Sequence, residues 1–198
     1  MALSALQEFF IHLKAAPGLA AGNVLDVRPA EAFETAHLAG AASHPLEEGN
    51  GAWVGPDNLE KELPSIFLPP RHEPLVVIGT RPEEIDRLAV HLAGRDRAGV
   101  SGLALSPEVA VQLPGEMMEV GPSDHCLWKP PAWLEQHVGL LPPPVAGPVL
   151  DLACGSGRAV VWLAQRGYSV TGVDWQEPAL ALGQRLAAHR KVDCCFLE

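Results

Sequence analysis

The sequence predicts an α/β fold whose sheets are mainly parallel. Short apolar runs that end in a polar residue or a glycine alternate with segments of helical periodicity, which is the pattern of repeated βαβ units. These runs cover residues 24–27, 75–78, 149–152 and 168–173. Of the 198 residues, 47% are hydrophobic and 19% are charged, so the chain can bury a core.

The expected elements of the first half follow from periodicity and from prolines. Leu6, Phe9 and Leu13 recur at helical spacing, and Pro29 and Pro82 suit the first turns of helices. Helices are expected over residues 5–14, 30–35, 58–67 and 83–93, and strands over 23–28, 74–79 and 100–105. Residues 107–120 are expected to form a helix-like or extended connector.

The second half begins with a proline-rich connector and then repeats a strand–helix pattern. Helices are expected over residues 131–138, 158–166 and 178–190, and strands over 149–152, 168–173 and 192–197. The corresponding domain limits are 1–120 for a first α/β domain, 121–147 for a linker with a lead-in helix, and 148–198 for a second, partial domain.

The net charge of −10 is uneven along the chain. Residues 1–120 carry 8 Lys and Arg against 17 Asp and Glu, whereas residues 121–198 carry 6 against 7. Because non-specific binding of nucleic acid needs a cationic surface, we do not expect it here. The charge does not exclude a specific RNA or protein substrate for the second half.

The cysteines and the apolar runs bear on location. The four cysteines, Cys126, Cys154, Cys194 and Cys195, form no disulfide framework of a secreted domain. No stretch approaches about 20 uninterrupted apolar residues, so no membrane span is expected, and the first residues lack the pattern of a signal peptide. We therefore expect a cytoplasmic protein. The histidines have no metal-ligand spacing, and no metal site is predicted.

Residues 24–48 and 74–93 carry a resemblance to rhodanese-like domains. The segment VLDVRPAEAFETAHLAGAASHPLEE and the segment PLVVIG with its following loop and helix come in the order typical of that family. The resemblance implies a small α/β domain with a mainly parallel sheet. It places His37 in a structural turn, and we interpret Asp26 and Arg28 as a structural ion pair.

The loop after residues 75–78 departs from the active rhodanese pattern. In active members of that family, a nucleophilic cysteine follows this strand and heads a loop of backbone N–H groups that holds a persulfide anion. Here Gly79 follows the strand, the loop is the short Thr80-Arg81-Pro82, and Pro82 removes an amide donor. We therefore expect no sulfur transfer. Arg81 as an anion-binding residue remains an alternative to a solvated loop residue.

Two cofactor interpretations compete for the glycine motif in residues 149–176. A dinucleotide fingerprint requires a third glycine, but Val160 stands at that position. Asp151, just before the turn, would repel a pyrophosphate and suits a cationic ligand. Asp174, at the end of the next strand, can accept hydrogen bonds from ribose hydroxyls. These residues favour S-adenosylmethionine, which has an ammonium and a sulfonium and no phosphate.

The pattern VLDLACGSGR…VTGVDWQEPAL resembles the cofactor motif of class I S-adenosylmethionine-dependent methyltransferases, which have a Rossmann-like fold. The resemblance implies that Asp151, Ala153, Gly155 and Gly157 line the methionine end of the cofactor. It implies that Asp174 holds the ribose, and that Trp175 and Gln176 flank the adenine. The upstream LWKPPAWL segment resembles the lead-in found where a rhodanese-like domain is fused to such a methyltransferase.

The resemblance also implies a sheet of about seven strands, of which residues 148–198 provide three in the order 3-2-1. We therefore expect a truncated methyltransferase domain whose first strand is an edge. The sequence predicts a methyltransferase with a silent rhodanese-like domain; the alternative is a non-catalytic binding or scaffold protein with a protein partner. It identifies neither the methyl acceptor nor the catalytic residues.

Overall fold

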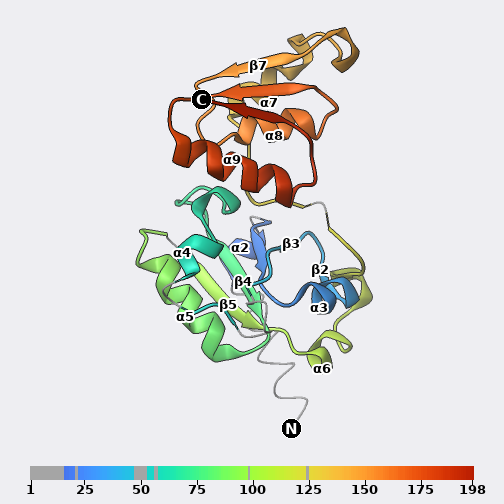
Figure 1. Ribbon diagram of the computed structural model, residues 1–198. Coiled ribbons are helices and arrows are strands. Elements are labelled where there is room, and N and C mark those ends of the chain that lie inside the picture. Colours follow the sequence, from blue (N-terminus) through green and yellow to red (C-terminus); the bar gives the residue numbers. More distant parts are fainter. Residues whose placement is uncertain (1–15, 21, 47–52, 56–57, 98, 124) are drawn as a thin grey trace. The chain divides into compact units, whose positions relative to one another are not determined.

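The computed structural model describes residues 16–20, 22–46, 53–55, 58–97, 99–123 and 125–198 (Figure 1). The chain divides into two compact units, Met1–Leu127 and Trp128–Glu198. The helix predicted over residues 5–14 lies outside the described residues. Both units have mixed α/β folds with parallel sheets, which confirms the predicted fold class.

The first unit is organised around a four-stranded sheet in the order β3-β1-β4-β5. All three strand pairs are parallel, with Leu25 opposite Val77 and Val77 opposite Gly102 in register. The strands are β1 Val24–Asp26, β3 Ala42–Ser43, β4 Leu75–Gly79 and β5 Val100–Ala104. This topology is the mainly parallel sheet that the sequence predicts.

The central strand β4 is buried along its whole length. Because side chains alternate along a strand, Val76 and Ile78 enter one core, which also contains Phe33. Helix α5, Pro82–Ala93, packs on β4 and β5 (Figure 1). A central parallel strand with both faces covered has a continuous apolar sequence, and the sequence LVVI of β4 is of this kind.

Helix α5 approaches the sheet closely because two strand residues lack side chains. A Cβ added at Gly102 would lie 2.2 Å from Cγ2 of Ile85, and one added at Gly79 would lie 2.7 Å from its Cγ1. Ile85 therefore occupies the space above the two glycines, and the carboxyl end of β4 and the middle of β5 pack closely against α5. The remaining helical segments are α2 Pro17–Ala20, α3 Ala30–Thr35, α4 Leu59–Glu62, η2 Ser65–Phe67, α6 Pro107–Ala110 and η3 Gly115–Met117.

Two features of the first unit differ from the sequence prediction. The single helix expected over residues 58–67 is split into α4 and η2, because Pro64 has no N–H and disfavours helical backbone at Leu63. In the stretch predicted as a helix-like or extended connector, β6 Met118–Glu119 forms a strand that pairs antiparallel with β2 His37–Leu38.

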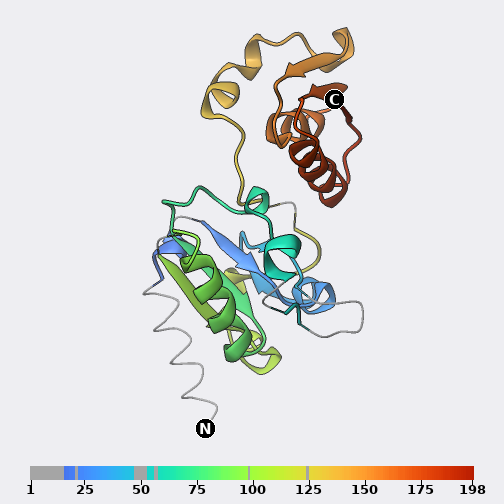
Figure 2. The same cartoon turned by 60° about the vertical axis from the view of Figure 1, so that its left-hand side comes forward.

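The second unit contains a three-stranded parallel sheet in the order β7-β8-β9. Its strands and covering helices are β7 Val149–Leu152, α8 Arg158–Ala164, β8 Val170–Val173, α9 Glu177–His189 and β9 Cys195–Leu197. Helices α8 and α9 lie side by side against one face of the sheet (Figure 2). The helical segments α7 Ala132–His137, η4 Val138–Leu140 and η5 Pro144–Ala146 precede it.

The predicted strand order is confirmed, and β7 is an edge strand within the described sheet. Leu150 and Leu152 point to the face opposite the helices and are 59% and 69% exposed. Leu197 on β9 lies on that same face, because Leu152 pairs with Val173 and Val173 pairs with Leu197. Its side chain is half exposed. An apolar sheet face in the second unit is therefore accessible to solvent.

Candidate cofactor site

The glycine turn and the second acidic motif meet at one edge of the second unit's sheet. Strands β7 and β8 are parallel neighbours, so the loops that follow them emerge at the same end. The first loop covers residues 153–157, and the second covers residues 174–176. A crevice at the carboxyl ends of parallel strands is where ligands bind in open α/β sheets.

The first loop turns sharply because three of its residues have left-handed backbone. The φ angles are 58° at Ala153, 54° at Gly155 and 69° at Gly157, where α8 begins. Glycine adopts this conformation without strain, whereas the non-glycine Ala153 is unusual there. The Cys154 N–H donates to the carbonyl of Val173 at 3.0 Å, which anchors the loop on the end of β8.

Asp174 links the two loops through its carboxylate. Oδ2 accepts a hydrogen bond from the Gly155 N–H at 2.8 Å, and Oδ1 accepts one from the Gln176 N–H at 2.9 Å. The residue is only 8% exposed. Each carboxylate oxygen keeps a further lone-pair site, because an ionised carboxylate can accept about four hydrogen bonds.

A second carboxylate, that of Asp151, lies near the same loop. Burial raises the pKa of this carboxyl above its ordinary value. Burial also raises the pKa of the Cys154 thiol, and the negative charges of Asp151 and Asp174 raise that pKa further. Both carboxylates therefore lie close enough to act on Cys154. A protonated, partly buried thiol of this kind is a packing group and a poor nucleophile.

The glycines at this edge have different surroundings. A Cβ at Gly157 would lie 2.4 Å from the ring of Phe196, and one at Gly172 would lie 2.8 Å from the Cys154 sulfur. Nothing within 4 Å would meet a Cβ at Gly155. Gly157 and Gly172 therefore serve packing, while Gly155 borders open space.

The structure brings the sequence-predicted residues to one end of the sheet. Asp151 is the third residue of β7, and Ala153, Gly155 and Gly157 form the loop after it. Asp174 follows β8 directly, with Trp175 (78% exposed) and Gln176 (exposed) beside it. Sequence reasoning did not find the packing role of Phe196, although its alternation along β9 was a usable signal.

The groups at this edge of the sheet fit the S-adenosylmethionine that the motif implies. The two acids can face cationic and hydroxyl groups, the open side of Gly155 leaves room for a ligand close to the backbone, and Trp175 offers an exposed ring. Asp174 has acceptor capacity beyond its two backbone partners. The predicted roles of the individual residues stay predictions.

The first unit holds the Asp26–Arg28 pair in its interior. Asp26 is fully buried, and the Arg28 Nη2 donates to its Oδ2 at 2.7 Å. His37 is buried and stacks on Phe33 with ring centroids 3.8 Å apart, as a structural residue does. At the end of β4, Arg81 pairs with Glu84 of α5.

The described part of the chain has neither a metal-ligand cluster nor a membrane-spanning helix. It contains no group of three or more His, Cys, Asp or Glu side chains placed to hold a metal ion. Among those same residues, no helix is both long enough and apolar enough to cross a membrane.

The second unit is similar to known methyltransferase domains. Residues 149–198 match the family described as a methyltransferase domain. The chain is 42% identical over 52 residues to the ubiquinone biosynthesis O-methyltransferase of Pseudomonas fluorescens, covering 26% of this chain and 21% of that protein. It is 26% identical over 172 residues to the uncharacterized protein UNK4.09 of Schizosaccharomyces pombe, covering 81% of this chain and 46% of the relative.

A rhodanese-like domain is among the similar solved structures. The Rhodanese_3-like domain of the Alr3790 protein from Anabaena sp. is 21% identical, with a TM-score of 0.34, over 52% of this chain and 96% of that chain. Residues 149–198 match a methyltransferase domain, as the sequence predicted. It spans less than half the length of the two curated relatives named above.

Proposed function

We propose that this protein is an S-adenosylmethionine-dependent methyltransferase whose rhodanese-like unit is catalytically silent. The observation that carries the proposal is the Asp174 carboxylate, which joins the glycine loop to the end of β8 through the N–H of Gly155. This arrangement leaves a carboxylate and an open glycine backbone at the same edge of the sheet. The match of residues 149–198 to a methyltransferase domain supports it.

In this proposal the chain's own residues bind and orient the cofactor. Asp174 accepts from the ribose hydroxyls, Asp151 faces the cationic methionine end, and Trp175 packs on the adenine. When bound, S-adenosylmethionine supplies a methyl group on a sulfonium, which an acceptor takes by in-line attack. Catalysis of such a transfer is mainly positioning of the two reactants. The methyl acceptor is not assigned.

Calorimetry with S-adenosylhomocysteine tests the proposal. We expect micromolar binding to the full chain and a loss of about tenfold or more in Asp174→Asn, because a hydrogen bond to a charged group contributes about 1.5–3 kcal/mol. Asp193→Asn is the matched control, since Asp193 is an exposed acid of the same unit. Trp175→Ala, at an exposed position, should weaken binding several-fold without affecting the fold, because aromatic stacking contributes about 0.5–1.5 kcal/mol.

Absence of binding by the folded wild-type chain would contradict the proposal. Equal weakening in Asp174→Asn and Asp193→Asn would show that the effect is one of net charge. Transfer of a radiolabelled methyl group to protein, RNA and small-molecule fractions of a cell extract would then identify the acceptor class.

A non-catalytic binding protein is the second candidate function. It is favoured by the end of β4, where the helix begins directly at Pro82 and the Arg81 guanidinium is paired with Glu84. A loop this short does not form the cradle of N–H groups that holds a persulfide. A thiosulfate:cyanide assay should show no turnover. Failure to bind S-adenosylhomocysteine together with such inactivity would favour this second candidate.

A further inference from the structure

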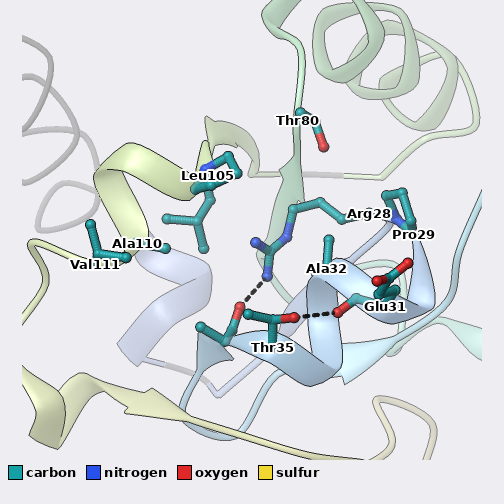
Figure 3. A pocket seen from close by; sticks show the side chains of 11 residues that line it. Arg28, Pro29, Glu31, Ala32, Thr35, Thr80, Leu105, Ala110 and Val111 are labelled. Atoms are coloured by element: carbon teal, nitrogen blue, oxygen red, sulfur yellow. Dashed lines mark hydrogen bonds between the residues drawn. The ribbon is translucent and has the colours of Figure 1, made fainter.

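A pocket of about 350 Å³ lies in the first unit, where β1, β4 and β5 end (Figure 3). Ala32 and Thr35 of α3 form one wall, Leu105 and Ala110 form another, and Thr80 follows β4 at the rim. The lining is mostly apolar, and Leu105 is fully buried. Small-molecule sites in proteins have volumes of about 300–1,000 Å³ and are mainly apolar with a few polar groups.

The charges around the pocket do not favour an anion. The Arg28 guanidinium is already paired with Asp26, through Nε at 2.9 Å and Nη2 at 2.7 Å. Glu31, on the same helix as the apolar wall, adds a negative charge to the lining. An incoming anion would therefore meet a neutralised cation and a carboxylate.

One nitrogen of the Arg28 guanidinium, Nη1, is left for a ligand. Nη2 also donates to the carbonyl of Ala36 at 2.8 Å, so Nε and Nη2 are both engaged. Within the described ranges, Nη1 of Arg28 has no hydrogen-bond acceptor. Figure 3 shows the guanidinium in the pocket, between Leu105 and Ala32. The site therefore offers apolar walls and one polar anchor.

We propose that this pocket binds a small neutral apolar molecule with a single hydrogen-bond acceptor, such as an aryl ketone or an aryl amide. The apolar body contacts Ala32, Ala110 and Val111, and its acceptor receives the Nη1 hydrogen bond of Arg28. A single polar anchor of this kind gives orientation and specificity, while the apolar contact gives most of the affinity. The site uses the end of the sheet for ligand binding without a cysteine nucleophile.

Fluorescence titration of the full chain with the neutral acylnaphthalene dye Prodan tests this proposal. We expect a blue-shifted emission that saturates, and displacement by neutral acetylnaphthalene but not by naphthoate of the same size. Ala32→Leu places a larger side chain in the pocket and should weaken dye binding at least tenfold. Ala30→Leu is the matched control, because Ala30 is exposed on the same helix and does not line the pocket.

A second variant keeps the test valid if Ala32→Leu fails to fold. Val111 lines the pocket yet is 83% exposed, so Val111→Trp can obstruct the pocket without disturbing the core. It should also weaken dye binding, with an unchanged circular dichroism spectrum. Absence of dye binding, stronger displacement by naphthoate, or equal affinity in Val111→Trp, Ala32→Leu and Ala30→Leu would each overturn the proposal.

Discussion

The Gly155 N–H donates to the Asp174 carboxylate at 2.8 Å, across 19 residues of sequence. This contact makes one site from two loops that the chain separates by a helix and a strand. Because the same carboxylate also accepts from the Gln176 N–H, its orientation is fixed before any ligand arrives. Preorganised polar groups reduce the entropic cost of binding.

Gly157→Ala should mainly lower the free energy of unfolding, whereas Gly155→Ala should mainly affect ligand binding. A methyl group at Gly157 would lie 2.4 Å from Phe196, so overpacking should cost about 1–3 kcal/mol of unfolding free energy, in addition to backbone strain. A methyl group at Gly155 meets no atom within 4 Å, so only backbone strain of about 1–2 kcal/mol is expected. It would, however, occupy the open space beside the proposed cofactor.

Hydrogen exchange of the α8 amides and binding of S-adenosylhomocysteine measure the two effects separately. We expect Gly157→Ala to accelerate exchange more, and Gly155→Ala to lose affinity although its fold is retained. Unchanged affinity in a folded Gly155→Ala would argue against a ligand at this loop.

Asp151→Asn should stabilise the second unit at neutral pH. Burial raises the pKa of the Asp151 carboxyl, so the folded state binds a proton more tightly than the unfolded chain. The free energy of unfolding therefore falls as the pH rises from the ordinary pKa through the raised one. The variant avoids this loss, and its advantage should disappear at a pH below the ordinary pKa of an aspartate.

Hydrogen exchange of the α8 amides at a series of pH values checks this prediction, with Asp193→Asn as a control for net charge. The same Asp151→Asn variant should bind S-adenosylmethionine more weakly, since the carboxylate is proposed to face the cationic methionine end. A variant that is no more stable than the wild type at about pH 7 would contradict the argument from burial.

The order of strands and helices could be predicted because each element carries its own local pattern. The apolar run of β4 and the proline at the start of α5 are signals within a few residues, and the observed bounds agree closely. The pairing of β2 with β6 could not be predicted, since two-residue strands 80 residues apart have no periodicity to detect. The pocket could not be predicted either, because α6 and Leu105 meet Arg28 only through the tertiary fold.

The candidate cofactor site was largely predictable for a related reason. Asp151, the glycines and Asp174 stand at strand ends, and parallel neighbours bring such ends together. The hydrogen bond from Gly155 to Asp174 and the contact of Phe196 with Gly157 depend on side-chain positions, which no local pattern specifies.

Gly102→Ala should destabilise the first unit through Ile85. The added Cβ would lie 2.2 Å from Cγ2 of Ile85, so we expect a loss of about 1–3 kcal/mol from overpacking. Ile85→Ala alone should cost about 2–5 kcal/mol, because it leaves a cavity under α5. In the double variant the new methyl group fills part of that cavity, so its cost should be smaller than the sum of the two. Additive losses in hydrogen exchange of β4 would contradict the packing inferred here.

Asp26→Ala should be among the most destabilising single substitutions in the first unit. The residue is fully buried, and its removal leaves the Arg28 guanidinium, itself only 4% exposed, without its counter-charge. Breaking a buried ion pair in this way costs about 3–5 kcal/mol, whereas replacing both partners by apolar residues of similar volume is often nearly neutral. The double variant Asp26→Leu with Arg28→Met should therefore be more stable than Asp26→Ala. Hydrogen exchange of the β4 amides measures the first unit alone, and Asp86→Ala, at an exposed acid of α5 in the same unit, is the control. If Asp26→Ala exchanged no faster than Asp86→Ala, the pair would not be the buried, mutually neutralised unit that keeps the charge of Arg28 from a ligand in the pocket beside it.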